Sequence, residues 1–231
     1  MTSLSKRILL GITGKNPQQL QNKIAEAEKL KIKRIAIFLE FLNKIQRKKI
    51  YSTLLSSKIK KIPFVHARHD MSLEELQFLK KQFKTKYFNI HEEDFKQIKN
   101  WKDFQKKILI EFNYDNKIPN YINMEKTGGF CVDLSHFKSA EERWTSEFEY
   151  IFLRKKHKDW FIANHLNGYS KTHRKDLHTI KSLKEFNYLK TLPKFIFGKY
   201  IALETFNSLK EQLKFKKYII KILKTNSNLL S

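Results

Sequence analysis

Residues of the types that bind divalent metals stand at the ends of the short apolar runs in this sequence. Eight β-branched or aromatic runs occur along the chain, and six of them end in such a residue: His66, His91, Glu111, Asp133, His165 and Glu204. Imidazole nitrogen combined with carboxylate oxygen suits Zn²⁺, Mn²⁺ or Fe²⁺. One His or Asp at the end of a strand is most often a hydrogen-bonded structural residue. Such residues at the ends of six runs out of eight are hard to attribute to chance, because the runs are defined by hydrophobicity alone. We therefore predict a metal centre.

Three further ligand types follow these runs closely. His136 lies three residues after Asp133 in the segment CVDLSH, and Asp176 and His178 lie in RKDLH, after the seventh run. A lone Asp-x-His in a polar loop is usually a solvated segment. Nine ligands, however, are too many for one ion and suit two or three. Two ions about 3.5–4 Å apart can stabilise both the attacking and the leaving oxygen of a phosphoryl displacement.

The elements that must position these residues alternate between strand and helix. The predicted strands are residues 7–12, 34–39, 62–66, 87–91, 108–111, 130–133, 160–165 and 200–204. The predicted helices are residues 17–30, 43–57, 72–83, 94–106, 139–155, 182–189 and 209–223. Asn16 before Pro17 is a typical helix start, and Ser72 with Glu75 forms a capping-box pattern.

This alternation predicts an α/β protein with a parallel sheet. The strands are nearly continuous apolar runs, as expected for strands covered on both faces. Eight units within 231 residues favour one closed (β/α)8 TIM barrel, a single domain over residues 1–231. An open doubly wound sheet is the alternative, but GITG after the first strand is neither a GxGxxG turn nor a P-loop. In a barrel the carboxyl ends of the strands form the active site, so the strand-end residues should converge.

The amino-acid composition limits the classes of molecule that the chain is expected to bind. Lys and Arg number 47 against 23 Asp and Glu, giving a formal net charge of +24. Such a surface attracts polyanions, namely DNA, RNA, phosphorylated metabolites or anionic lipid, although a Lys-rich chain can also reflect coding bias. Of these, DNA is the expected partner. The single cysteine, Cys131, excludes a disulfide scaffold. No apolar run has the length of a membrane span and no secretory signal begins the chain, so we expect no membrane association and a cytoplasmic location.

The motifs together resemble a known family. HA at His66, IHEE at His91, IEFN at Glu111, CVDLSH, HLNGYSKTHRKDLH and ALET at Glu204 occur in the order typical of the endonuclease IV family of apurinic/apyrimidinic endonucleases. That family is a branch of the xylose isomerase-like TIM-barrel superfamily. The resemblance extends from about Arg7 to the C-terminal helix. It implies a DNA-repair hydrolase that binds three zinc ions and cleaves the DNA backbone 5′ to abasic sites.

The resemblance also implies a role for each ligand. It assigns His66 and His91 to a first zinc ion and Glu111 to a bridge between the first and a second. Asp133, His165 and Glu204 would complete the second site. His136, Asp176 and His178 would hold the third ion. Glu204 would also lie near the attacking nucleophile, so Glu204 and Glu111 are the expected catalytic residues.

Two departures from the family pattern keep other functions open. Ala67–Asp70 replaces the family's Pro-Tyr loop after His66, and TIKSLKEF replaces the Gly-rich stretch after His178. These changes bear on abasic-site specificity and not on the metals. The alternative function is a sugar or sugar-phosphate isomerase or epimerase with a phosphorylated sugar as partner, in which Glu111 and Glu204 would be the acid/base pair. A barrel that binds without catalysis is a third possibility, which the intact ligand set disfavours.

Overall fold

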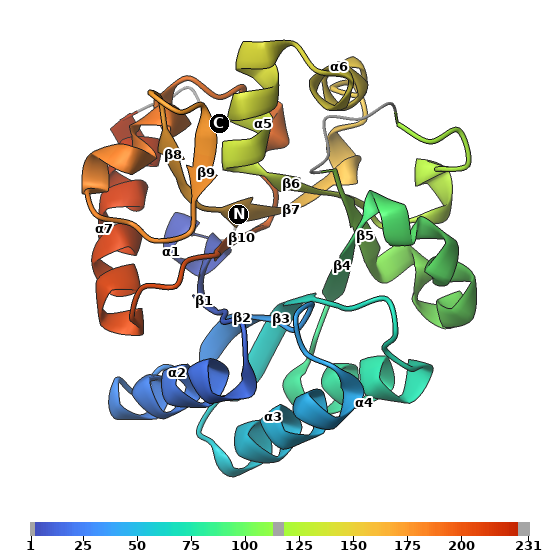
Figure 1. Ribbon diagram of the computed structural model, residues 1–231, viewed down its shortest axis with the longest axis vertical. Coiled ribbons are helices and arrows are strands. Elements are labelled where there is room, and N and C mark those ends of the chain that lie inside the picture. Colours follow the sequence, from blue (N-terminus) through green and yellow to red (C-terminus); the bar gives the residue numbers. More distant parts are fainter. Residues whose placement is uncertain (1–2, 113–117, 226–231) are drawn as a thin grey trace.

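Eight parallel strands close into a barrel in the computed structural model, which describes residues 3–112 and 118–225 (Figure 1). The strands are β1 (Ile8–Ile12), β2 (Arg34–Phe38), β3 (Lys61–His66), β4 (Tyr87–His91), β5 (Ile108–Glu111), β6 (Gly129–Asp133), β7 (Phe161–Leu166) and β10 (Tyr200–Leu203). Each pairs with the next strand of the barrel, and β10 closes it by pairing with β1. The fold is therefore a (β/α)8 TIM barrel, which confirms the predicted fold class.

Helices surround the ring of strands in Figure 1. The α-helices are α1 (Leu4–Arg7), α2 (Pro17–Lys29), α3 (Lys44–Ser56), α4 (Leu73–Phe83), α5 (Leu134–Arg143), α6 (Ser146–Leu153) and α7 (Leu209–Thr225). The 3₁₀ helices are η1 (Glu92–Lys107), η2 (Met124–Lys126), η3 (Lys158–Trp160), η4 (Leu183–Lys190) and η5 (Lys194–Ile196). Asn16 caps α2 by accepting a hydrogen bond from the Gln19 amide, as predicted. Of the described helices, none has the length and apolar character needed to cross a membrane.

Two apolar layers hold the barrel together. Successive residues of β1 alternate between them, so Leu9 faces the barrel interior while Ile8 and Leu10 pack toward the helices. The interior layer consists of Leu9, Ala36, Phe38, Phe64, Leu109, Cys131, Ile162, Ala163 and Ala202. It fills the barrel below the predicted site, so the barrel is a packed core and not a pore.

Several predicted elements differ from the structure. The helices predicted over 94–106 and 182–189 are the 3₁₀ helices η1 and η4. The helix predicted over 139–155 starts earlier, at Leu134, and is divided into α5 and α6. Trp144 adopts a left-handed conformation there (φ 54°), and Thr145 caps the second helix by accepting a hydrogen bond from the Phe148 amide. The polar loop expected after the seventh strand is a hairpin of β8 (Gly168–Ser170) and β9 (Lys175–Leu177).

The closure between β1 and β10 depends on a glycine. A Cβ at Gly11 would lie 1.7 Å from the carbonyl oxygen of Leu203, so the two strands approach too closely there for any side chain. Gln212 of α7 holds this point from outside. Its Oε1 accepts from the Gly11 amide at 2.8 Å, and its Nε2 donates to the Gly11 carbonyl at 3.0 Å. The last helix is thereby fixed against the first strand, next to the strand end that carries Glu204.

Candidate metal centre

Strand register brings the predicted residues to one mouth of the barrel. Residues on neighbouring strands stand side by side in the pairs His66 and Asn89, His91 and Glu111, and Asp133 and His165. Glu204 directly follows β10, and its amide continues the pairing by donating to the Leu166 carbonyl at 3.1 Å. These residues share the inward-facing parity of their strands, and all lie at the carboxyl ends. That is the mouth where TIM-barrel active sites form.

Glu111 lies at the centre of an inner cluster. Its Oε1 is 2.8 Å from Nδ1 of His165, and its Oε2 is 3.9 Å from Nε2 of both His66 and His91. Among the described residues, three sets have ligand atoms that all lie within 4.8 Å of one another: His66–His91–Glu111, His66–His165–Glu204 and Glu111–Cys131–His165. Five of the six predicted strand-end ligands therefore share these compact sets.

Asp133 joins the inner cluster through an amide. Its Oδ1 accepts from the amides of Ser135 and His136, and so caps α5. Its Oδ2 accepts from Nδ2 of Asn167 at 2.8 Å, and the same Nδ2 lies 3.3 Å from Oε2 of Glu204. Asp133 thus has a structural role at a helix start, while its second oxygen shares the Asn167 amide with Glu204.

The three remaining residues form an outer cluster beside the inner one. Asp176 lies between two imidazoles, with Oδ2 2.9 Å from Nε2 of His178 and Oδ1 3.7 Å from Nε2 of His136. Nδ1 of His178 is 3.2 Å from the backbone oxygen of Glu204, which connects the two clusters. His136 is in the first turn of α5 and Asp176 is in β9. Figure 1 shows this hairpin strand running beside α5.

Mutual electrostatics stabilise charge in these clusters. Burial alone would raise the pKa of Glu111, but His165, His66 and His91 hold it well below its usual range. Burial raises the pKa of Glu204. Burial alone would lower the pKa of His178, but the hydrogen bond to Asp176 raises it to about 9. Positive charge on His178 therefore offsets the Asp176 carboxylate. A divalent cation offsets carboxylate charge in the same way when neutral imidazoles are its ligands.

Glu40 belongs to this site, although the sequence did not point to it. It lies two residues after β2, with Oε2 3.7 Å from Nδ1 of His66. Its side chain is only 11% exposed, and neither carboxylate oxygen hydrogen-bonds to another described residue. Burial, with the nearby Glu204 carboxylate, raises the pKa of Glu40 to about 8. The one available signal was a Glu immediately after the apolar run RIAIFL.

Two buried asparagine side chains also belong to the site, and the sequence patterns did not indicate them. Asn89 is fully buried and donates from Nδ2 to Oε2 of Glu111 at 2.6 Å. Asn167, also fully buried, bridges Asp133 and Glu204. Both fix the orientation of a carboxylate rather than offering a strong metal ligand. They were missed because amides are not among the residue types that mark a His/Asp/Glu site.

The residues fit a divalent metal centre. Mixed imidazole and carboxylate donors within 4.8 Å suit Zn²⁺ or Mn²⁺, and Glu40 supplies a buried carboxylate with unused acceptor capacity beside His66. An uncompensated buried carboxylate is costly, because desolvation opposes its charge. A cation at this mouth would remove that cost.

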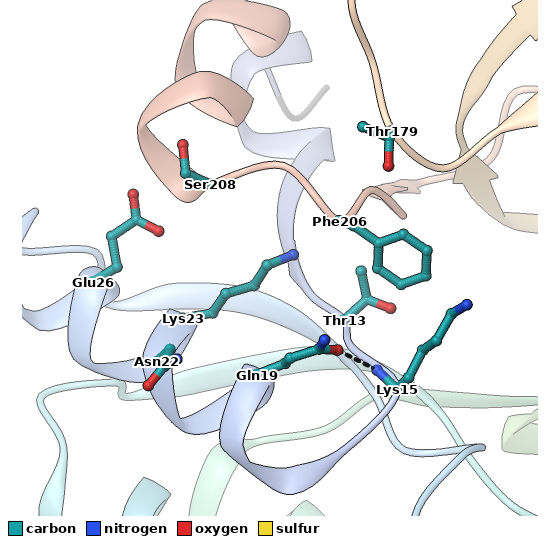
Figure 2. Close-up of a pocket in the computed structure, with 9 residues that line it drawn as sticks. All are labelled: Thr13, Lys15, Gln19, Asn22, Lys23, Glu26, Thr179, Phe206 and Ser208. Atoms are coloured by element: carbon teal, nitrogen blue, oxygen red, sulfur yellow. Dashed lines mark hydrogen bonds between the residues drawn. The ribbon is translucent and has the colours of Figure 1, made fainter.

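A cavity of about 680 Å³ lies beside the mouth (Figure 2). Its walls come from α2, from the loop after β1 and from the loop after β10, and they include Lys15, Lys23 and Phe206. Lys23 is buried and donates to the Thr205 carbonyl at 2.6 Å, so it anchors the segment that follows Glu204. Burial lowers the pKa of Lys23 to about 8, against the raising effect of Glu26.

A second cavity, of about 380 Å³, adjoins the outer cluster and is lined by Arg143, Arg174 and Lys175.

Comparisons with known proteins add little about activity. No family model matches the chain. No curated protein matches it either. Among solved structures, it is similar to an aldo-keto reductase from Bacillus halodurans in the holo form, with 9% identity, a TM-score of 0.38, and coverage of 94% of this chain and 86% of that chain. So distant a likeness says nothing about chemistry, and the site geometry is what remains to support a function.

Proposed function

We propose that this chain is a metal-dependent phosphodiesterase acting on DNA, similar to endonuclease IV. The observation that carries the proposal is the meeting of nine His, Asp and Glu residues from distant parts of the sequence in two adjoining clusters at one barrel mouth. A structural hydrogen-bond network would not need so many imidazoles beside buried carboxylates. Ions held there, zinc in first place and manganese in second, would number two or three.

Each group of residues has a part in this proposal. His66, His91 and Glu111 would hold one ion, and Glu111 together with Asp133, His165 and Glu204 would hold a second. His136, Asp176 and His178 would hold a third. Such ions neutralise phosphate charge and lower the pKa of water. Asn89 and Asn167 keep the carboxylates of Glu111 and Glu204 in place, and Glu204 is the general base nearest the outer cluster.

Basic residues beside the outer cluster would hold the DNA backbone. Arg174 and Lys175 line the cavity next to His136 and Asp176, and both are solvent-exposed. The hairpin β8–β9 carries them, together with the ligand Asp176. Phosphate contacts from this hairpin would therefore place a scissile bond near the ions. These positions support DNA as substrate better than an uncharged sugar.

The test combines metal analysis with a nicking assay. Protein purified without chelator should contain two to three equivalents of zinc and should nick abasic duplex. Glu204→Gln keeps the shape of the side chain but removes its charge and basicity. Loss of one preorganised electrostatic contact commonly costs about 10²–10³ in rate. We expect this variant to bind duplex as the wild type does and to nick it that much more slowly, whereas Glu149→Gln, an exposed control, should match the wild type.

A second candidate function is sugar isomerisation or epimerisation. Glu111 and Glu204 lie 2.8 Å and 3.5 Å from the same atom, Nδ1 of His165, so two carboxyl groups at the mouth are close enough to serve as an acid/base pair on one substrate. A panel of ketoses and their phosphates, assayed with the same metal-loaded protein, distinguishes the two. If the protein converts any of these sugars and does not nick DNA, the isomerase proposal is favoured and the phosphodiesterase proposal is rejected.

A further inference from the structure

A strongly basic cavity lies at the opposite end of the barrel from the candidate metal centre. Its volume is about 490 Å³, and six cationic side chains line it: Arg34, Lys61, Lys80, Lys84, Lys86 and Lys107. Arg34 and Lys61 are the first residues of β2 and β3, while Lys86 and Lys107 directly precede β4 and β5. The cavity is therefore formed by the amino ends of the strands, with α4 at its side.

Among the described residues, the cations of this cavity have no acidic partner. No Asp or Glu is among the described residues that line it, and no carboxylate of residues 3–112 or 118–225 makes a salt bridge to any of the six. Lys80 and Lys107 approach the same ring, with Nζ atoms 5.6 Å and 5.4 Å from the centre of Phe104. Partial burial, with Lys80 and Lys86 nearby, lowers the pKa of Lys107. Like charges held this closely repel one another unless an anion separates them.

The backbone around the cavity is well anchored. The Lys86 amide donates to the Pro63 carbonyl at 2.9 Å, and the Lys61 amide donates to the Lys33 carbonyl at 3.1 Å. Nη1 of Arg34 donates to the Lys6 carbonyl at 2.5 Å, which fixes the guanidinium at the rim. The cations thus extend from fixed points on several elements. A binding site needs this convergence, whereas lysines scattered over a solvated surface do not have it.

We propose that this cavity binds the polyphosphate group of a small anion. Six cations without carboxylates exceed what one phosphate needs, and the volume falls in the range of small-molecule sites, about 300–1,000 Å³. A concave pocket at the base of the barrel favours a compact ligand over duplex DNA, which would follow an extended basic stripe. Tyr200 also lines the cavity, with its ring centre 6.0 Å from that of Tyr87, and offers an aromatic surface next to the phosphates.

Isothermal titration calorimetry of the full chain, with EDTA present, tests this proposal. EDTA keeps ions from the metal centre, so phosphate binding through a metal ion does not contribute to the measured heat. We expect inorganic tripolyphosphate to bind and inorganic phosphate to bind at least tenfold more weakly. ATP is the second probe: binding tighter than tripolyphosphate identifies a nucleotide as the source of the polyphosphate, and equal binding identifies a free polyphosphate. Equal affinity for phosphate and tripolyphosphate would overturn the proposal.

A pair of matched double variants assigns the binding to this cavity. Lys86→Gln with Lys107→Gln removes two of its cations, and Lys48→Gln with Lys49→Gln removes two exposed charges from α3. A hydrogen bond to a charged group contributes about 1.5–3 kcal/mol, so one lost contact weakens binding about tenfold or more. We expect this loss in the first variant only, with no fall in its melting temperature. Equal losses in both variants, or loss of duplex DNA binding alone in the first, would contradict a polyphosphate site.

Discussion

Glu40 and His66 form a carboxylate–imidazole pair at the edge of the inner cluster. Nδ1 of His66 faces Glu40 at 3.7 Å, while Nε2 faces Glu111 at 3.9 Å. A metal-binding histidine commonly uses one ring nitrogen for the ion and donates from the other to a carboxylate, which fixes its tautomer and makes it more basic. In the proposed metal centre, Glu40 would therefore position His66.

Changing Glu40 should weaken metal binding. Glu40→Gln keeps the size of the side chain but removes the ionisable carboxyl group, and loss of such an outer partner typically costs about 10–100-fold in metal affinity. Competition for zinc with a chromophoric chelator measures the effect, and Glu149→Gln is the exposed control. An affinity equal to that of the wild type would show that Glu40 only packs against the ring.

The sequence indicated most of the His, Asp and Glu residues that meet at the barrel mouth, but not the residues that support them. His66, His91 and Glu111 were predicted because strand parity and strand ends can be read from a hydrophobic pattern. Glu40 lies beyond the strand end, where the path of the loop decides its direction. Asn89 has the right parity, but nothing in the sequence separates its amide from any other polar residue in a strand.

Among the glycines, Gly11 at the contact between β1 and β10 leaves the least room for a Cβ atom. We expect Gly11→Ala to lower the free energy of unfolding by about 1–3 kcal/mol or more, because its Cβ would meet backbone atoms that cannot move aside. Urea denaturation measures the change. Gly14→Ala is a matched control, since its Cβ would meet the side chains of Gln19 and Leu20. A loss at Gly11 no larger than that at Gly14 would mean that the barrel closure can adjust.

Helices α3 and α4 are joined by a buried ion pair that makes stability depend on pH. Arg47 is fully buried, and its Nε is 2.8 Å from Oε1 of Glu75. Burial alone would raise the pKa of Glu75, but the hydrogen bonds from Arg47 lower it below the ordinary value. A lowered folded-state pKa contributes stability above the unfolded-state pKa, and this contribution is lost as the pH falls through the folded-state value.

Urea titrations between about pH 6 and pH 3 test this ion pair. The wild type should lose stability as the pH falls over this window. Glu75→Gln should be less stable at neutral pH, because it leaves the Arg47 charge buried with fewer partners, and its stability should fall less steeply with acid. Glu125→Gln, an exposed control, should follow the wild type. If the free energy of unfolding falls equally steeply with acid in Glu75→Gln and in the wild type, this role of the ion pair is contradicted.

At the level of elements, hydrophobic periodicity predicted the eight barrel strands within one or two residues. It did not predict the helix types, because residues 92–107 and 183–190 adopt 3₁₀ geometry that the same apolar spacing permits. The hairpin β8–β9 was also missed. Its strands are three residues each, too short for an alternation to be recognised, yet the hairpin brings Asp176 to His136.

The positive charge of the whole molecule is distributed over both ends of the barrel. At the mouth, Arg174 and Lys175 lie beside the outer cluster, and at the opposite end Lys86 and Lys107 line the basic cavity. The net charge of +24 alone therefore cannot indicate which end meets DNA. Salt dependence separates them, because each phosphate neutralised by a protein cation contributes about 0.9 to the slope of log affinity against log salt.

The two ends should respond differently when their charges are removed. We expect Arg174→Gln with Lys175→Gln to reduce the magnitude of this slope for duplex DNA by about 2, because two phosphate contacts are lost. Lys86→Gln with Lys107→Gln removes the same charge from the other end and should leave the slope unchanged. Fluorescence anisotropy over a salt series, with a chelator present, measures both. Equal changes in the two variants would mean that DNA responds only to net charge, and a change confined to the second variant would place the DNA at the end opposite the metals.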